Sequence, residues 1–339
     1  MDIDPGRRRR TLAMLAVVPL AAAACASPST GNERTAGERR SGVDTRRNAP
    51  VGADPDSPAA TATQPAGATR PAGATRPPPA LPAEARDARY LLLGELHDNP
   101  HVHRLRLDWL RQLKTETRFV LAMEQFDVTM QPRLDEARVR LAREGGPQEQ
   151  RARQLAQAAG FAFDGWDWPL YEPVVSFALH KDLPLIGANL SNADASAVAR
   201  GRAATIDAAA PAGWTAADEA AMRAAIRDGH CGLLPESAVD GMVRAQLARD
   251  RTMARALCEA ARRTGLPVVL LAGNGHVRAD IGVPRHLAEF DRDASVVAIG
   301  LGEDEAPPIG RFDSFLSVAP VKRPDPCSAL RERFGGAKR

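Results

Sequence analysis

The sequence predicts an α/β domain in which a mostly parallel central sheet is flanked by helices. Short aliphatic runs recur along the chain, and each is continuous, as in strands that are covered on both faces. Amphipathic helical segments separate these runs, which favours parallel strands joined by crossovers. From Pro82 to Arg339 roughly 258 residues are available, which is ample for one domain of this class.

The strands can be assigned in chain order. The first five expected strands are rich in β-branched or other aliphatic residues, and turn residues follow them. Their ranges are Tyr90–Leu93, Phe119–Met123, Pro184–Ala188, Val268–Ala272 and Val296–Gly300. A weaker sixth run, "FLSVAP", comes after them.

The helix after the first strand can be placed most closely. Asn99 is a favoured N-cap residue, and Pro100 suits the first helical position. Apolar residues then recur at helical spacing, at Val102, Leu105, Trp109, Leu110 and Leu113. The sequence therefore predicts a strand, a short loop that carries Glu95 and His97, and a helix.

A second long helical stretch runs from about Ala216 to Thr264. The segment His230-Cys231-Gly232 interrupts its helical pattern. We expect this stretch to form a helical insertion or a lid over the sheet.

Residues 1–24 have the pattern of a bacterial signal peptide. Arg7–Arg10 form a positive start, and Leu12–Ala24 form an apolar stretch of 13 residues, too short to span a bilayer. Small residues then precede Cys25, which resembles the cysteine that carries the lipid in bacterial lipoproteins. The alternative is an ordinary secretory cleavage site with an incidental cysteine. In both cases we expect export to the bacterial envelope; in the first, Cys25 anchors the chain to a membrane, facing the periplasm or the cell surface.

Residues 26–83 are expected to form a disordered tether. Pro, Ala, Gly, Thr and Ser dominate, and "PAGATR" occurs twice in tandem, at Pro65–Arg70 and Pro71–Arg76. This segment has almost no apolar side chain larger than alanine, so it cannot bury enough surface to offset its ordering entropy. The α/β domain is expected over residues 84–322, and a C-terminal tail over residues 323–339.

The distribution of charge excludes one class of partner. Residues 1–80 hold 11 Lys and Arg against 7 Asp and Glu, whereas the remaining residues hold 34 against 35. The folded part therefore offers no net positive field, and we expect no nucleic-acid partner.

Three cysteines follow Cys25, at Cys231, Cys258 and Cys327. An oxidising compartment would permit one disulfide and leave one thiol, but the spacing chooses no pairing and matches no zinc motif. Cys258 lies in a helical pattern and is expected to be a small core residue.

Polar residues follow several predicted strands at the point where each strand ends. They are Glu95 and His97 after the first strand, Glu124 after the second, Asn189 after the third and His276 after the fourth. Ligands of open parallel sheets bind at this carboxyl edge. Two imidazoles and two carboxylates can hold a divalent metal with an open position, or can work as acid and base. We expect a functional crevice here.

Other polar residues near this edge have simpler interpretations. Asp98 is expected to assist the helix start. His101, near the start of the first helix, could still face the crevice, whereas His103 is expected on the solvent face. Among the later histidines, His180 and His286 are expected to have no functional role. Two roles are possible for His230: a contribution to the site or a local role in its loop.

Two further features are weaker indications. "GWDWPLYEPV" groups Trp166, Trp168 and Tyr171, as core packing or as the wall of a pocket for a flat apolar ligand. Arg249 and Asp250 lie in an amphipathic helix. They are expected to pair with each other or to reach the site, although surface charge is the commoner outcome.

Seven blocks in this order resemble one family: "LLLGELHDNPHVH", "AMEQF", "GWDWPLYEPV", "IGANLS", "GHCGLLP", "AQLARDRTMA" and "LAGNGHVR". Together they are similar to the ChaN-like lipoproteins, haem-binding uptake proteins of the Tiki/TraB/PrgY superfamily that are related in fold to erythromycin esterases. The resemblance covers nearly all of residues 89–302.

The resemblance implies two functions. The first is haem or iron binding at the envelope, with an imidazole of His97, His230 or His276, or the Tyr171 phenolate, on the iron. Asn189 and Arg249 are expected as further cofactor contacts. A small-molecule ligand, a homodimer and an envelope transport partner would accompany this function.

The second implied function is metal-dependent hydrolysis by the residues that match the superfamily motifs. His97 and His276 would be metal ligands, and Glu95 or Glu124 a ligand or general base. A third reading is an interaction protein that keeps the crevice as a relic.

Overall fold

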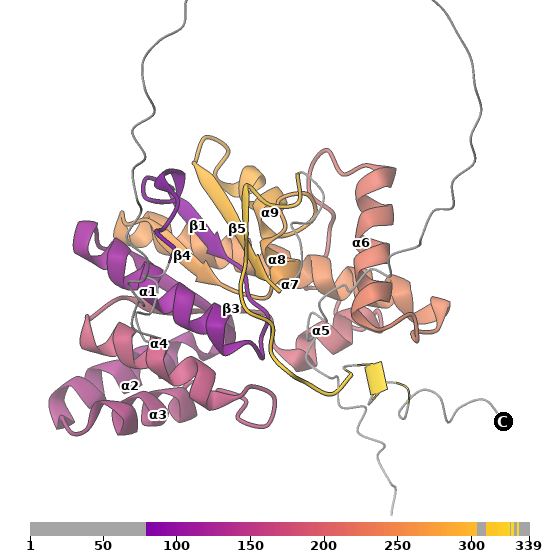
Figure 1. Cartoon of the computed structure of the whole chain (residues 1–339). Coiled ribbons are helices and arrows are strands. Elements are labelled where there is room, and N and C mark those ends of the chain that lie inside the picture. The colour runs from indigo at the N-terminus through magenta and orange to yellow at the C-terminus, as the bar shows by residue number, and fades with distance from the viewer. Residues whose placement is uncertain (1–78, 304–309, 326, 329–330, 332–339) are drawn as a thin grey trace, which may run out of the picture. The chain divides into compact units, whose positions relative to one another are not determined.

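The computed structural model describes residues 79–303, 310–325, 327, 328 and 331 (Figure 1). The predicted signal peptide, its Cys25 anchor and residues 26–78 of the tether lie outside the described residues, as do most residues of the predicted C-terminal tail. In the described part, no helix is long and apolar enough to cross a membrane.

A parallel sheet forms the centre of the domain, as predicted. In the described residues it has six strands in the order β3-β2-β4-β1-β5-β6, and every pair of neighbours is parallel. The strands are β1 (Tyr90–Leu93), β2 (Val120–Asp127), β3 (Leu185–Asn189), β4 (Val268–Leu271), β5 (Val296–Gly302) and β6 (Ser314–Ser317). The sixth, weaker run is thus an edge strand, and β2 is longer than expected.

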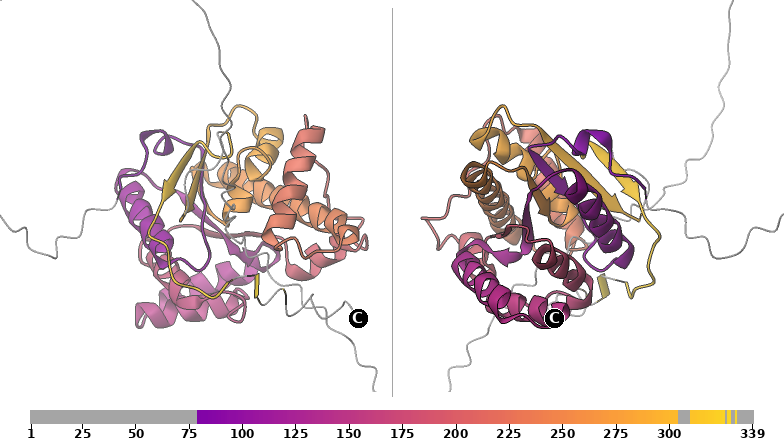
Figure 2. Two further views of the ribbon diagram at one scale, coloured as in Figure 1. Left: turned by 45° about the vertical axis from the view of Figure 1, so that its right-hand side comes forward. Right: turned by 90° about the vertical axis from the view of Figure 1, so that its left-hand side faces the viewer.

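Helices cover both faces of this sheet. In chain order the helical elements are η1 (Ala83–Ala85), α1 (Pro100–Glu116), η2 (Val128–Met130), α2 (Gln131–Glu144), α3 (Gln148–Ala158), α4 (Trp168–His180), α5 (Asn192–Ala199), α6 (Ala216–Gly229), α7 (Glu236–Thr264), α8 (Asn274–Val277) and α9 (Val283–Phe290). Helices α1–α4 pack on one face, and α7, α8 and α9 pack on the other (Figure 2).

The alternation of side chains along each strand explains these two layers. Leu91 and Leu93 of β1 join the core with α1–α4, whereas Tyr90 and Leu92 join the core with α7–α9. Successive side chains of a strand point to opposite faces, so continuous apolar runs supply both cores.

The start of α1 is as predicted. The Asn99 side chain accepts hydrogen bonds from the backbone N–H groups of His101 (2.7 Å) and Val102 (3.3 Å). This cap ends the loop after β1 at a defined residue and so fixes the direction in which that loop leaves the sheet.

The long helical stretch divides at the predicted interruption, but its second part is a layer of the fold itself. In α7, Met253 and Leu257 are fully buried in the core that contains Leu92 and Val120 of the sheet. Only α6 lies outside this layer, packed against α7 through Met222. The expected insertion is therefore limited to α6 and the turns around it.

The ends of the described chain are tied to the domain. The indole N–H of Trp109 donates to the carbonyl of Pro79 at 2.7 Å, so packing begins before the predicted boundary at residue 84. Arg323 pairs with Asp98 (2.7 Å) and Glu303 (2.6 Å).

A disulfide joins two distant parts of the chain. Cys231, in the turn between α6 and α7, pairs with Cys327, 96 residues away in sequence. Cys258 is a buried free cysteine in the core, as predicted.

Candidate functional site

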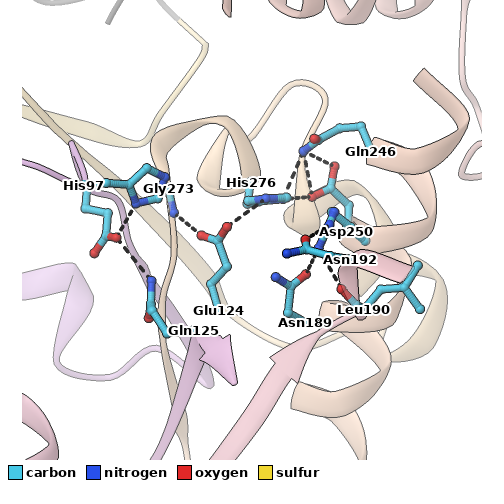
Figure 3. Close-up of polar contacts among 12 residues, drawn as sticks. His97, Glu124, Gln125, Asn189, Leu190, Asn192, Gln246, Asp250, Gly273 and His276 are labelled. Atoms are coloured by element: carbon cyan, nitrogen blue, oxygen red, sulfur yellow. Dashed lines mark hydrogen bonds and ion pairs between the residues drawn. The ribbon is translucent and has the colours of Figure 1, made fainter. Parts of the chain in front are cut away.

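Four predicted residues converge at the carboxyl ends of β1, β2 and β4: Glu95, His97, Glu124 and His276. Figure 3 labels the last three. The four residues meet around Gly273, two residues after β4 ends at Leu271. A Cβ atom on Gly273 would lie 2.9 Å from His97 Nε2 and 3.6 Å from a Glu124 oxygen. Only glycine leaves room for this approach, so the crevice depends on the backbone of residue 273.

Glu95 is the centre of a fully buried hydrogen-bonded cluster on the α1 and α4 side of the sheet. Its carboxylate accepts from the Tyr171 hydroxyl at 2.7 Å and from the Gln125 amide at 3.3 Å, and it forms an ion pair with Arg106. Burial raises the pKa of Glu95, but Arg106 and the neighbouring imidazoles outweigh it and hold the pKa well below its usual range. Glu95 is therefore an ionised acceptor.

His97 is oriented by this carboxylate. Its Nδ1 lies 2.5 Å from Glu95 Oε1, so Nδ1 carries the proton and donates. Nε2 is buried and has no hydrogen-bond partner among the described residues, and the ring meets Trp166 edge-on at 4.8 Å between centroids. Burial lowers the pKa of His97, but the bond to Glu95 outweighs it and the net shift is upward.

His103 corrects a prediction, because it lies in the interior and not on the solvent face. It is 8% exposed. Arg106 donates to its Nδ1 at 3.0 Å, so Nε2 carries the proton and donates to the His97 carbonyl at 3.0 Å. Burial lowers the pKa of His103 to about 4, which keeps it neutral. It fixes the backbone that presents His97.

His276 lies on the other side of the sheet, between two carboxylates. Its Nδ1 is 2.5 Å from Asp250 Oδ1, and its Nε2 is 3.4 Å from Glu124 Oε1. The second Glu124 oxygen accepts from the Gly273 N–H at 2.7 Å, and the Gln246 amide donates to Asp250 at 3.3 Å. We call Asp250, His276 and Glu124 the His276 triad.

The opposite charges of this triad stabilise each other's ionised forms. Burial alone would lower the pKa of His276, but Glu124 and Asp250 raise it to about 10. Burial alone would raise the pKa of Glu124, but His276 lowers it to about 2. At neutral pH the histidine is therefore an imidazolium held between two carboxylates.

Asn189 and Arg249 form a further wall beside the triad. Arg249 is 4% exposed and donates to the Asn189 side-chain oxygen at 2.7 Å, and burial lowers the pKa of Arg249. A cavity of about 50 Å³ separates this wall from the triad. Its polar lining includes Glu124, Asp127, Asn189, Arg249 and His276.

Other predicted site residues lie elsewhere or face inward. The His230 Nδ1–H donates to the Ile226 carbonyl at 2.7 Å, at the end of α6. Tyr171 is fully buried and donates to Glu95, and burial raises the pKa of its phenol. His286, for which no functional role is expected, is fully buried in α9.

The site also contains residues that the motif pattern missed or ranked low. They are Arg106, His103 and Gln125 around Glu95, and Gln246 and Asp250 around His276. For most of them, the position on the helix could have indicated burial. Arg106 falls on the same face as Val102 and Trp109, and Asp250 on the same face as Val243 and Leu257, so each interrupts an apolar face.

The crevice offers few free ligand atoms for a divalent metal and too small a cavity for haem, the two cofactors that the sequence suggested. Within the described ranges, no group of three or more His, Cys, Asp and Glu side chains is arranged to hold a metal ion. Both nitrogens of His276 face carboxylates, so His97 Nε2 is the imidazole donor that remains. A porphyrin needs a pocket of several hundred Å³, far more than the 50 Å³ cavity, so the crevice as it stands does not fit an enclosed haem.

Comparison with known proteins agrees with the fold and identifies the family. A family model described as haem-binding uptake, Tiki superfamily, ChaN, matches residues 81–287. A solved structure described as cofacial haem binding to ChaN of Campylobacter jejuni is 25% identical, with a TM-score of 0.58, and the match covers 68% of this chain and 87% of that one.

A more distant similarity is to an erythromycin esterase in its open conformation, at 15% identity and a TM-score of 0.37, covering 66% of this chain and 75% of that one. Among curated proteins, no sequence matches. The family match spans well over half of the chain, so this protein belongs to the ChaN family of haem-binding uptake proteins in the Tiki superfamily.

Proposed function

We propose that this protein is an exported lipoprotein that binds haem at the bacterial envelope and is anchored through Cys25. The family match and the similar Campylobacter jejuni protein support haem as the ligand. The Cys231–Cys327 disulfide supports export, because such bonds persist mainly in oxidising compartments.

The haem would bind at an open surface, since the crevice is too small to enclose it. Cofacial binding is the mode named for the Campylobacter jejuni protein, and an open surface would permit the same mode here. A homodimer that shares haem would provide one, and an envelope transport partner would take the haem onward.

Among the predicted iron ligands, His230 is the one that an outside haem can reach most directly. It is half-buried in the turn between α6 and α7, and its Nδ1–H donates to a backbone carbonyl at 2.7 Å. This bond fixes the tautomer and leaves Nε2 as the free nitrogen, the usual arrangement of a metal-binding histidine. In contrast, Tyr171 and His276 are buried and engaged.

Titration of the full chain with haemin tests this proposal. Wild type should give a saturable shift of the Soret band, and size-exclusion chromatography should report any dimer. His230→Ala should weaken or remove the shift, whereas the exposed control His180→Ala should keep it. A chain that shows no saturable binding would contradict haem binding. Loss of haem binding in His97→Ala but not in His230→Ala would show that His97 of the crevice, and not His230, is the iron ligand.

A second candidate function is hydrolysis in the crevice, because each of two histidines has a carboxylate 2.5 Å from its Nδ1. His97 Nε2, unpartnered and opposite Glu124, would take a proton from water as general base. A metal ion, if bound, would lower the pKa of the attacking water, and His97 Nε2 is the unpartnered nitrogen of the crevice that could hold it.

A panel of activated esters and amides tests hydrolysis. His97→Gln should abolish any turnover, and His101→Gln, which changes a half-buried histidine on α1, should leave it intact. Metal analysis of the same protein, purified without chelator, decides whether the reaction is metal-dependent. Equal turnover in His97→Gln and wild type would refute a role for the crevice.

A further inference from the structure

Arg249 is a buried cation whose hydrogen-bond partners among the described residues are all neutral. It is 4% exposed, and among the described residues it forms no ion pair. Its guanidinium donates instead to three neutral oxygens at 2.7 Å each: the side chains of Asn189 and Asn192 and the carbonyl of Leu190. Glu124, Asp127 and Asp250 act on this charge from a distance, without direct contact. A buried charge whose direct partners are neutral is still costly, so its position beside the cavity points to a role there.

The guanidinium fixes the direction of two amides. Because arginine only donates, Asn189 and Asn192 must present their oxygens to it and their NH₂ groups to the other side. Both asparagines line the cavity, and in Figure 3 their nitrogen atoms point to the side of Glu124. In the described part of the chain, neither NH₂ group donates to a protein acceptor.

The lining of the cavity also carries the carboxylates of Glu124 and Asp127. The His276 imidazolium, 3.4 Å from Glu124 and shared with Asp250, offsets part of this negative charge. The cavity therefore has fixed amide donors on one side and the Glu124–His276 pair of the triad on the other. A volume of about 50 Å³ holds three or four groups of the size of water, at roughly 10–15 Å³ each. A carboxylate or a short acyl group has this size.

We infer that Arg249, Asn189 and Asn192 form a donor pocket that binds the oxygen of a carboxylate or acyl carbonyl. The two NH₂ groups would contact the ligand, and Arg249 would act as a positioning residue through them. The inference deepens the second proposed function, on which its catalytic meaning rests, because it names the substrate class as compounds with a short acyl group. The binding site itself can be tested without any turnover.

The test uses acetate and the full chain with ¹⁵N-labelled asparagine side chains. Acetate should shift the Asn189 amide signals saturably in NMR spectra, and chloride at equal ionic strength should not. Asn189→Asp is the decisive variant. It keeps an oxygen for Arg249, and so the fold, but it replaces the donor by a negative group and should weaken acetate binding at least tenfold.

Two arginine variants complete the test. Arg249→Lys keeps the charge but loses the fork that orients both amides, and it should weaken binding severalfold. Arg255→Met, an exposed position on the same helix, should change nothing. Acetate binding that is absent in wild type, or unchanged in Asn189→Asp, would overturn the donor pocket even if esters are hydrolysed. Acetate binding with this pattern in a chain that hydrolyses no ester would support the pocket and overturn only the second function.

Discussion

Replacing Asp250 by Asn should destabilise the protein in a way that depends on pH. The substitution preserves shape but removes one of the two charges that hold His276 as an imidazolium. The pKa of His276 is raised from 6.5 to about 10, which corresponds to about 5 kcal/mol of stabilisation. Asp250 supplies a large share of this, and breaking a buried pair costs roughly 3–5 kcal/mol.

The sign follows from the raised pKa. Below pH 6.5 the imidazole is protonated in both folded and unfolded chains, and the full contribution is present. Between pH 6.5 and about 10 only the folded protein holds the proton, so the contribution falls by about 1.4 kcal/mol per pH unit, and above this range it is gone. The difference between wild type and Asp250→Asn should therefore be largest at pH 6 and close to zero near pH 10.

Urea unfolding followed by circular dichroism from pH 6 to 10 measures this difference. Asp108→Asn is the control, since its pair with Arg111 lies at the surface and should contribute under about 1 kcal/mol at every pH. NMR titration of the His276 ring gives the pKa directly. A difference that stays constant over the whole range, or a wild-type pKa near 6.5, would refute the assignment of an imidazolium.

Three further outcomes are expected. Tyr171→Phe removes a buried bond to a charged acceptor and should lower the free energy of unfolding by roughly 1.5–3 kcal/mol, while the haemin spectrum stays unchanged; a lost Soret shift would contradict the buried position of this hydroxyl. Gly273→Ala would place a Cβ 2.9 Å from His97 Nε2 and should reduce any ester turnover on the order of 100-fold, with little change in the far-UV spectrum. Reduction of Cys231–Cys327 opens a loop of 96 residues and should lower stability by roughly 4.7 kcal/mol in urea unfolding; a Cys231→Ser chain should not respond to the reductant.

The sequence predicted the sheet closely because its apolar runs are continuous and bounded by turn residues. The range of β1 agreed to the residue, and β2 was ended too early. Glu124 and Gln125 continue β2 as buried polar residues. A prediction from hydrophobicity alone ends the strand at the first charged residue, Glu124. Burial of such residues depends on partners from distant helices, which no local pattern displays.

The site was predicted in part for the same reason. The residues at strand ends, Glu95 and His276 among them, were found because parallel strands end at one edge. Arg106 was not considered for the site, and for Asp250 a contact with the site was left open beside the commoner outcome of surface charge, because a charge on a helix usually faces solvent. Each nevertheless falls on the apolar face of its helix, where a charge is costly unless a partner of opposite sign is near. His103 was misplaced because its burial depends on a hydrogen bond from Arg106, a residue to which the sequence assigned no role.

The adjacent residues Glu124 and Gln125 have a consequence for how the chain pairs its strands. They point to opposite faces of β2, the carboxylate to His276 and the amide to Glu95. A slip of β2 by one residue would exchange them, set two buried carboxylates against each other, and leave the imidazolium with an amide. Apolar residues on both sides of β2 would tolerate such a slip far better than this pair does. The polar residues of the site therefore also help to fix the register in which β2 pairs with the neighbouring strands.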